Sequence, residues 1–392
     1  MSNQKQINVG VIGAGWMGHV HARAYSRLRH HFPSGGRTPV VIAVADSVPA
    51  QVDDFVSRHG VETSYADWRD LVADPRIEAI SVTAPNFLHR EIGTAVAAAG
   101  KHLWIEKPVG LDAPDAEAVA AAVAAAGVVS TVGFNYRHVP AVMRARDLIR
   151  NGAIGRPTHA RISLLTDYAA HPGGPLSWRY TLERGGRGIL GDLASHGIDL
   201  ARFLLGDLDD VVSITDTFIP QRPVVDAGSS HYSIADPNDP NVTMGEVENE
   251  DYVACLMRTL SGVSVMMESS RAAVGDQNHY VFEVHGTGGL VRWDFRRSDE
   301  LDVSSGDEYA NQPTITSFSG PGDGDYLSFQ PGAGIAMSYD DTKVIEAYGF
   351  MRAIAGEDTD GPTILDAVAS ARALDAIVVS AREHAWVSIA KS

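Results

Sequence analysis

Cysteine is almost absent from this chain, because Cys255 is the only one among 392 residues. A lone cysteine excludes an intramolecular disulfide framework and any zinc site built on several thiolates, so we expect a reducing compartment. The chain also lacks a run of 18 uninterrupted apolar residues, and the polar residues 1–6 contain no apolar signal core. These absences predict a cytoplasmic protein without a transmembrane helix.

Positive charge is scarce as well. Lysine and arginine number 32 against 49 aspartates and glutamates, which gives a formal net charge of −17. This charge opposes binding to nucleic acid or to an anionic membrane, and no basic run overrides it. The chain is 44% apolar and 21% charged, a globular balance, and its length favours two domains.

The first third of the sequence alternates short apolar segments with helical patterns. This alternation predicts a doubly wound parallel sheet, an α/β Rossmann domain over residues 1–135. Asp112 is the expected N-cap of the last helix in this part. The expected strands are 7–12, 40–45, 77–82, 102–105 and 128–132, and the expected helices are 18–29, 50–59, 68–73, 88–99 and 113–126.

Beyond about residue 150, strand patterns follow one another without helices between them. Glycine-containing turns separate them, which predicts an α+β domain over 136–392 with an open, mostly antiparallel sheet. Segments 220–248 and 306–334 lack periodicity and are expected loops. The expected strands are 211–219, 252–260, 263–269, 280–285 and 290–295, and the expected C-terminal helices, which can pack back on the first domain, are 341–355 and 364–383.

A glycine motif follows the first expected strand directly. Residues 13–18 read GAGWMG, a complete G-x-G-x-x-G between strand and helix. In this arrangement the glycines provide a tight turn, close approach to a pyrophosphate and close helix–strand packing, and the helix N-terminus attracts the phosphates. The motif predicts dinucleotide binding; the alternative is a merely structural turn. The expected cofactor contacts here are Gly13, Gly15, Trp16, Met17 and Gly18.

Asp46 ends the second expected strand and bears on the choice of cofactor. A carboxylate there accepts hydrogen bonds from the adenosine ribose and repels a 2′-phosphate. Ser47 follows where an arginine would hold that phosphate, and residues 30–39 lengthen the spacing from the glycine motif. We therefore expect NAD rather than NADP; the alternative is a solvated turn aspartate.

Lys107 lies within Glu106–Lys107–Pro108, which closes the fifth expected strand. Open α/β sheets bind ligands at this carboxyl edge. The proline favours an extended conformation at Lys107 and is compatible with a cis bond. A cation held at the sheet edge suits catalysis, although a simple turn is the alternative.

A second polar group lies in the glycine-rich segment 185–200. If the chain is helical from about Ile189, Asp192, His196 and Asp199 fall at i, i+4 and i+7 and share one face. Histidine is suited to exchange a proton near neutral pH, and a nearby carboxylate can orient it. A metal site of these three residues is an alternative, which the nearby lysine and expected cofactor disfavour.

Four segments together match the pattern of one family: 13–18, Thr83–Ala84–Pro85–Asn86 with His89, 106–108, and the glycine-rich run into Asp192, His196 and Asp199. This pattern resembles the Gfo/Idh/MocA oxidoreductases, and the likeness spans nearly the whole chain. Through 134–137 and 175–179 the chain is similar to levoglucosan and inositol-type dehydrogenases, and the insertion at 30–39 is seen in the former.

The resemblance implies hydride transfer between a sugar, anhydrosugar or cyclitol hydroxyl and NAD, with Lys107, Asp192 and His196 as the catalytic set. His196 takes the hydroxyl proton, Lys107 stabilises the alkoxide-like charge and Asp192 orients the pair. It also implies a homodimer or homotetramer formed through the C-terminal sheet. Further expected cofactor contacts are Thr83, Pro85, Asn86, His89, Glu106 and Lys107, and expected substrate contacts are Asn135, Arg137, Asp167, Trp178, Arg179 and Asp199.

Several of these assignments have structural alternatives. Asn86 is equally suited to capping the N-terminus of a helix. Arg137 is equally suited to a position on the surface. Trp178 and Asp199 are equally suited to a role in packing. Two rival functions also stay open. A dinucleotide sensor would keep the glycine motif without catalysis, and an NAD-dependent glycosidase would use the same residues.

Overall fold

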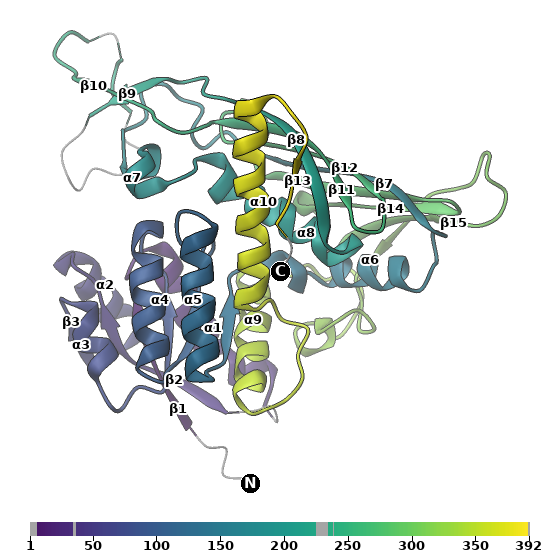
Figure 1. The fold of residues 1–392 in the computed structure, drawn as a ribbon. Coiled ribbons are helices and arrows are strands. Elements are labelled where there is room, and N and C mark those ends of the chain that lie inside the picture. Colours follow the sequence, from purple (N-terminus) through teal and green to yellow (C-terminus); the bar gives the residue numbers. More distant parts are fainter. Residues whose placement is uncertain (1–5, 34–36, 225–233, 238, 391–392) are drawn as a thin grey trace. The chain divides into compact units, whose positions relative to one another are not determined.

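The computed structural model describes residues 6–33, 37–224, 234–237 and 239–390 (Figure 1). The chain forms two compact units. Unit 1 comprises Met1–Pro140 and Gly320–Val368, and unit 2 comprises Ala141–Ser319 and Ala369–Ser392. Each unit therefore contains segments that are far apart in the sequence.

Unit 1 contains a six-stranded sheet in the order β3-β2-β1-β4-β5-β6. Every neighbouring pair is parallel, which confirms the predicted sheet. Strand β3 is the one addition, a short polar segment at the edge that shows no apolar pattern. The strands are β1 (Gln6–Ile12), β2 (Thr38–Ala45), β3 (Thr63–Tyr65), β4 (Ala79–Val82), β5 (His102–Ile105) and β6 (Ser130–Val132); the helices are α1 (Trp16–His31), α2 (Pro49–His59), α3 (Trp68–Ala73), α4 (His89–Ala98) and α5 (Ala113–Ala126).

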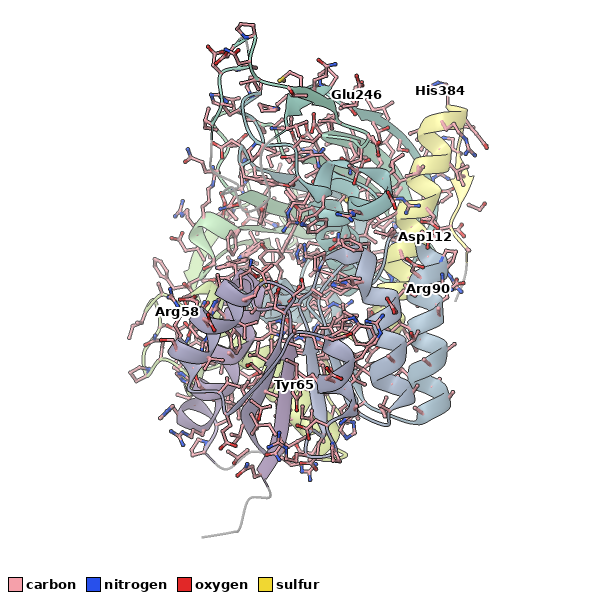
Figure 2. The ribbon with its side chains drawn as sticks, turned by 90° about the vertical axis from the view of Figure 1, so that its left-hand side faces the viewer. Arg58, Tyr65, Arg90, Asp112, Glu246 and His384 are labelled. Carbon is pink, nitrogen blue, oxygen red and sulfur yellow. The ribbon has the colours of Figure 1, made fainter. Side chains whose placement is uncertain are left out.

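The ends of α5 follow from local chemistry. Asp112 is labelled in Figure 2. Its side chain accepts a hydrogen bond from the Asp115 amide at 3.0 Å, which confirms the predicted N-cap. Gly127 ends the helix with a φ of 63°, a conformation that glycine adopts without strain.

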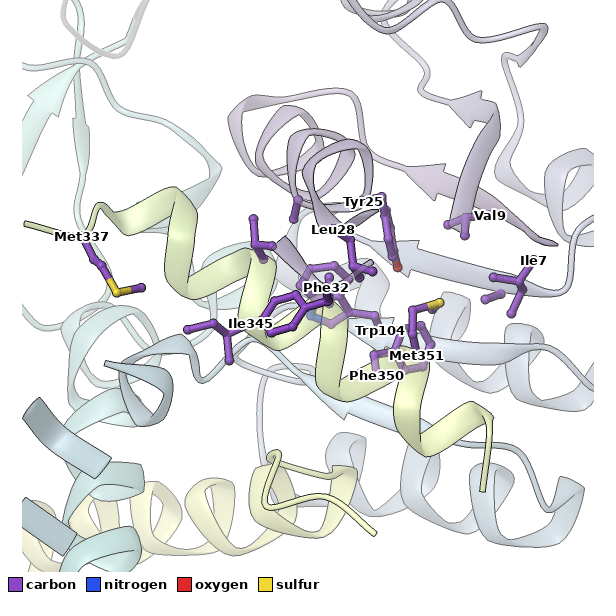
Figure 3. Packing of buried hydrophobic residues seen from close by; sticks show 14 of the residues in the cluster. Ile7, Val9, Tyr25, Leu28, Phe32, Trp104, Met337, Ile345, Phe350 and Met351 are labelled. Carbon is purple, nitrogen blue, oxygen red and sulfur yellow. The ribbon is translucent and has the colours of Figure 1, made fainter. Parts of the chain in front are cut away.

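Helix α9 (Tyr339–Ile354) packs against α1 within unit 1, although more than 300 residues separate them. Its apolar side chains Ile345, Phe350 and Met351 join Tyr25 and Trp104 in one buried core (Figure 3). Burial of large apolar side chains contributes about 1.5–3 kcal/mol each, so this core fixes α9 to the sheet.

Unit 2 is built on a nine-stranded sheet in the order β16-β15-β14-β13-β7-β12-β11-β8-β17. Only β12 and β7 pair in parallel among these strands, which confirms the predicted mostly antiparallel sheet. The strands are β7 (Pro157–Leu165), β8 (Leu208–Asp216), β11 (Tyr252–Thr259), β12 (Ser264–Ser270), β13 (His279–Gly286), β14 (Gly289–Asp294), β15 (Glu300–Ser305), β16 (Ile315–Phe318) and β17 (Val387–Ser388); the helices are α6 (Pro140–Arg150), α7 (Leu182–Gly185), α8 (Ser195–Leu205) and α10 (Ile364–Glu383), whose first residues belong to unit 1.

Three sequence predictions for this part are incomplete. Strand β7 is not among the expected strands: its buried residues alternate with exposed ones as in a half-buried strand, but the low β propensity of Pro157 and Ala160 weakens this pattern. The expected loop 220–248 contains a short hairpin, β9 (Gln221–Pro223) with β10 (Met244–Glu246), and its residues 225–233 and 238 lie outside the described residues. The expected loop 306–334 contains β16. The short strands β9, β10 and β16 form because a neighbouring strand supplies their hydrogen bonds, which local periodicity does not reveal.

Candidate functional site

The glycine turn between β1 and α1 uses each glycine for a different reason. Gly13 has a φ of 99°, and a Cβ there would lie 2.7 Å from the Thr83 carbonyl group. A Cβ at Gly18 would lie 2.1 Å from the Gly13 carbonyl oxygen, so this position packs the helix against the turn. A Cβ at Gly15 would meet no atom within 4 Å. The open space at Gly15 fits the close approach of a pyrophosphate.

Trp16 and Met17 begin α1 beside this turn. The first turn of the helix contains no acidic side chain, so its amide groups face the turn without a competing carboxylate. Trp16 is 66% exposed and stacks on Tyr339 at 5.7 Å between ring centroids. Because Trp16 directly follows Gly15, this stacked pair lies at the N-terminus of α1, next to the glycine turn in the sequence.

Asp46 follows β2 and lies against the same turn. Its carboxylate accepts hydrogen bonds from the Ala14 amide at 2.8 Å and the Val48 amide at 2.9 Å. The first of these bonds ties the end of β2 to the glycine motif. Each carboxylate oxygen keeps further acceptor capacity for a hydroxyl group.

The segment after β4 is held rigidly. The Thr83 hydroxyl donates to the carbonyl oxygens of Ile12 and Gly13, and the partly buried Pro85 and Asn86 lead into α4, whose N-terminus has no side-chain cap. The alternative capping role of Asn86 is therefore wrong. His89 is buried, with its ring nitrogens 2.7 Å from the carbonyl oxygens of Ala84 and Pro108, and burial lowers its pKa.

Lys107 follows β5 at the same carboxyl edge, because all six strands run parallel. The Lys107–Pro108 peptide is cis. The Lys107 amide lies 3.3 Å from the Glu106 carboxylate, and His89 bonds to the next residue's carbonyl oxygen. The backbone is thus held on both sides of Lys107.

Asn135 and Arg137, two expected substrate contacts, are buried within unit 1. Asn135 donates to the Thr342 hydroxyl at 3.1 Å, and Arg137 pairs with Asp366 at 2.9 Å. The alternative that Arg137 lies on the surface is therefore wrong. Both side chains join the segment after β6 to the C-terminal part of the unit.

In unit 2, close backbone contacts explain the glycine-rich segment before α8. A Cβ at Gly188 would lie 2.3 Å from the Glu250 carbonyl oxygen, so a side chain there would separate the two segments. The Glu250 carboxylate then accepts the Leu190 amide at 2.9 Å, while burial raises the pKa of Glu250. The helical segment that leads into α8 therefore begins at Leu190, where the Glu250 carboxylate accepts the first amide.

Asp192 lies in a π-helical turn, Leu190–Ala194, that runs directly into α8. The expected α-helix from Ile189 is therefore wrong in its first turn, which is wider; such turns are frequent at functional sites. Asp192 is half-buried, while His196 and Asp199 are buried. Asp192 lies in the wider turn and His196 in the first turn of α8, so an acid and an imidazole occupy successive turns of one helical segment.

Tyr168 is the site residue that sequence reasoning missed. Its hydroxyl donates to Asp192 at 2.5 Å, and its pKa is raised because the group is buried and Asp192 lies beside it. Although its hydroxyl is desolvated, the residue as a whole is 47% exposed. No sequence signal pairs two residues 24 apart in separate elements. The buried Arg222 holds the carbonyl groups of Ala169 and His171, which keeps this loop in place.

The remaining expected substrate contacts also lie in unit 2. Trp178 is half-buried and carries the exposed Arg179 guanidinium 4.6 Å from its ring centroid. Asp167 is half-buried next to Tyr168. Among the described residues, no group of three or more histidine, cysteine or acidic side chains could hold a metal ion. No helix in the described ranges is long and apolar enough to cross a membrane.

Comparison with known proteins agrees with this geometry. Residues 7–134 match the family model described as "Oxidoreductase family, NAD-binding Rossmann fold", and residues 142–292 match the "GFO/IDH/MocA C-terminal domain". The chain is 36% identical to levoglucosan dehydrogenase of Pseudarthrobacter phenanthrenivorans over 98% of both chains. It is 28% identical to inositol 2-dehydrogenase of Rhizobium meliloti over 98% of this chain and 99% of that one.

Solved structures give the same result. A levoglucosan dehydrogenase in complex with NADH and L-sorbose has a TM-score of 0.92 and 36% identity, covering 98% of this chain and 99% of that one. The complex of levoglucosan dehydrogenase with NADH and levoglucosan has a TM-score of 0.91 and 35% identity, covering 99% and 100%. The predicted family, its oxidoreductase activity and its NAD-binding Rossmann domain are confirmed. The chain belongs to the Gfo/Idh/MocA family of NAD-binding oxidoreductases.

Proposed function

We propose that this enzyme transfers a hydride between a hydroxyl group of a sugar, anhydrosugar or cyclitol and NAD. One observation in unit 1 carries the proposal. The open glycine turn after β1, the rigid loop after β4 and Lys107 after β5 all lie at the carboxyl edge of one parallel sheet. The relatives named above for levoglucosan and inositol support this substrate class.

In the proposed reaction, NAD supplies the hydride acceptor. His196 removes the proton from the substrate hydroxyl, and the Lys107 ammonium donates a hydrogen bond to the same oxygen as negative charge develops there. Asp192 orients the reacting groups. Its bond from Tyr168 and its place in the π-helical turn support this role, because both restrict its position.

Asp46 favours NAD over NADP in this proposal. Its carboxylate already accepts the Ala14 amide of the glycine turn, so its negative charge is held where the adenosine ribose is expected. Contacts to the cofactor also come from the segments containing Trp16, Thr83 and Asn86. The proposed substrate contacts are Asn135, Arg137, Asp167, Trp178, Arg179 and Asp199.

We also propose that copies of the chain associate through the sheet of unit 2 as a dimer or tetramer. One face of this sheet is covered by α8, whose Gly197 lies against Leu164 and Met267. On neighbouring strands Leu256 pairs with Met266, and these apolar side chains are 51% and 44% exposed. Light scattering after size exclusion measures the mass; a monomer at micromolar concentration contradicts this proposal.

A substrate panel tests the function. Levoglucosan, monosaccharides and inositols are incubated with NAD or NADP, and the absorbance of the reduced cofactor is followed. We expect activity with NAD on at least one of these polyols. Release of free sugar from a glycoside without net NADH would indicate a glycosidase, and NADH binding without turnover would indicate a sensor.

The roles are tested on the substrate that the panel identifies. His196→Ala should lower kcat by about 10²–10⁴-fold, the usual contribution of a general base, with the Kd for NADH nearly unchanged. NADH fluorescence gives that Kd. An equal loss of cofactor affinity would contradict the role of His196.

A further inference from the structure

A charged cluster is buried in the core of unit 1 and includes three side chains without an assigned role. The Lys343 ammonium on α9 lies 2.6 Å from the Glu106 carboxylate and 3.2 Å from Glu346. His21 on α1 bonds to the same Glu106 oxygen at 3.0 Å. The Trp104 indole donates to Glu346. Lys343 and His21 are 0% exposed, and Glu346 is 1% exposed.

Such a cluster is a costly way to fill a core. Desolvation of buried ions often exceeds their attraction, so apolar residues of similar volume are frequently as stabilising. Trp104, which bonds to Glu346, belongs to a core of large apolar side chains that includes Tyr25, Phe350 and Met351 (Figure 3). Packing alone would therefore be served by a methionine at position 343. The ammonium points to a function that an apolar side chain could not supply.

The Glu106 carboxylate connects this cluster to Lys107. One of its oxygens accepts Lys343 and His21, and the other lies 3.3 Å from the Lys107 amide. Gly133 at the end of β6 lies against the same carboxylate, since a Cβ there would be 2.3–2.5 Å from its three atoms. The carboxylate is thus enclosed by α1, α9 and the end of β6.

The position of Lys343 is itself fixed. A capping box between Ser338 and Asp341 starts α9, and Arg23 and Arg27 on α1 pair with Asp340 and Asp341. These contacts hold the first turns of α9 on α1. The ammonium one turn later is therefore presented to Glu106 in one orientation.

We propose that Lys343 is a positioning residue for catalysis: it anchors the Glu106 carboxylate, and Glu106 in turn holds the backbone of Lys107 in its reactive position. This inference rests on the proposed role of Lys107. A misplacement of about 1 Å can cost roughly 10²-fold in rate, so a small movement of Glu106 is enough to lower activity.

The test compares Lys343→Met, Gly133→Ala and Lys107→Met on levoglucosan or another substrate that the panel identifies. Lys343→Met keeps the volume and removes the anchor, and Gly133→Ala crowds the same carboxylate from the end of β6. Each should lower kcat roughly 10- to 100-fold while KM and the Kd for NADH stay within about threefold. Gly349→Ala on α9, where a Cβ meets no atom within 4 Å, is the control and should keep full activity.

The pH profile separates positioning from structural damage. Burial raises the pKa of Glu106, but Lys343 and His21 more than offset it and hold that pKa below its ordinary value. Without Lys343, burial prevails and the carboxyl group takes up a proton at higher pH. Lys343→Met should therefore show an acid limb in kcat at least 1 pH unit above that of the wild type, with activity recovering as pH rises.

The outcomes distinguish this inference from the proposed function. If Lys107→Met keeps its activity, the proposed role of Lys107 fails. If Lys107→Met is inactive while a folded Lys343→Met matches the wild type in kcat and pH profile, only the inference on Lys343 is overturned. Should Lys343→Met not fold, Gly133→Ala decides: wild-type kcat and pH profile in that variant overturn the inference.

Discussion

Two glycines of the same turn should respond in opposite ways to one added methyl group. In Gly18→Ala the Cβ would lie 2.1 Å from the Gly13 carbonyl oxygen, which belongs to the backbone and cannot rotate away. The turn must then move, at the 1–3 kcal/mol or more that overpacking typically costs. Gly15→Ala meets no atom within 4 Å, and its φ of −74° suits alanine. Its stability should change by less than about 1 kcal/mol, because the lower entropy of the unfolded chain is offset by the poorer fit of alanine at an N-cap.

For cofactor affinity we expect the substitution at Gly15, which hardly affects stability, to have a large effect. The methyl group of Gly15→Ala occupies the space expected for the pyrophosphate, so the Kd for NADH should rise at least about tenfold, or 1.4 kcal/mol. Thermal unfolding without ligand and a fluorescence titration with NADH measure the two effects. A Gly15→Ala variant that binds NADH like the wild type would refute the placement of the pyrophosphate at this turn.

Three further variants probe other contacts. Tyr168→Phe removes the hydrogen bond from Tyr168 to Asp192 and should lower kcat about tenfold or more, with a stability loss of at most about 1.5–3 kcal/mol; unchanged kcat argues against a role for this bond. Burial raises the pKa of Glu346 to about 7. The Glu346 carboxyl group loses its proton near pH 4.5 in the unfolded chain and near pH 7 in the folded chain. The stabilisation that is present at low pH therefore declines by about 3 kcal/mol between these two values. Glu346→Gln should remove that decline when the free energy of unfolding is measured against pH. Arg271→Met leaves the buried Asp251 carboxylate unpaired and should cost about 3–5 kcal/mol in denaturant unfolding, whereas less than 1 kcal/mol would contradict a tightly paired ion.

The N-terminal half of the fold was predictable because its signals are local. Strand β1, the glycine turn and α1 lie within residues 6–31, and the helices 68–73 and 113–126 were predicted with the bounds that the structure has. Their apolar periodicity and caps act over a few residues. In unit 2 the strands bounded by glycine turns were predictable for the same reason, whereas β7 was not. Its place at the centre of the sheet comes from pairing with β12 and β13, more than 100 residues away.

In the candidate site, too, local features were predictable from the sequence and long-range contacts were not. The sequence alone predicted the glycine turn, the Lys107 segment and the candidate residues Asp192, His196 and Asp199, because each lies in a short motif with characteristic residue types. Tertiary structure alone decided which groups surround them. Lys343 reaches Glu106 across 237 residues, and Tyr168 reaches Asp192 from a separate loop. Such contacts depend on how helices and strands pack, and no local pattern records that packing.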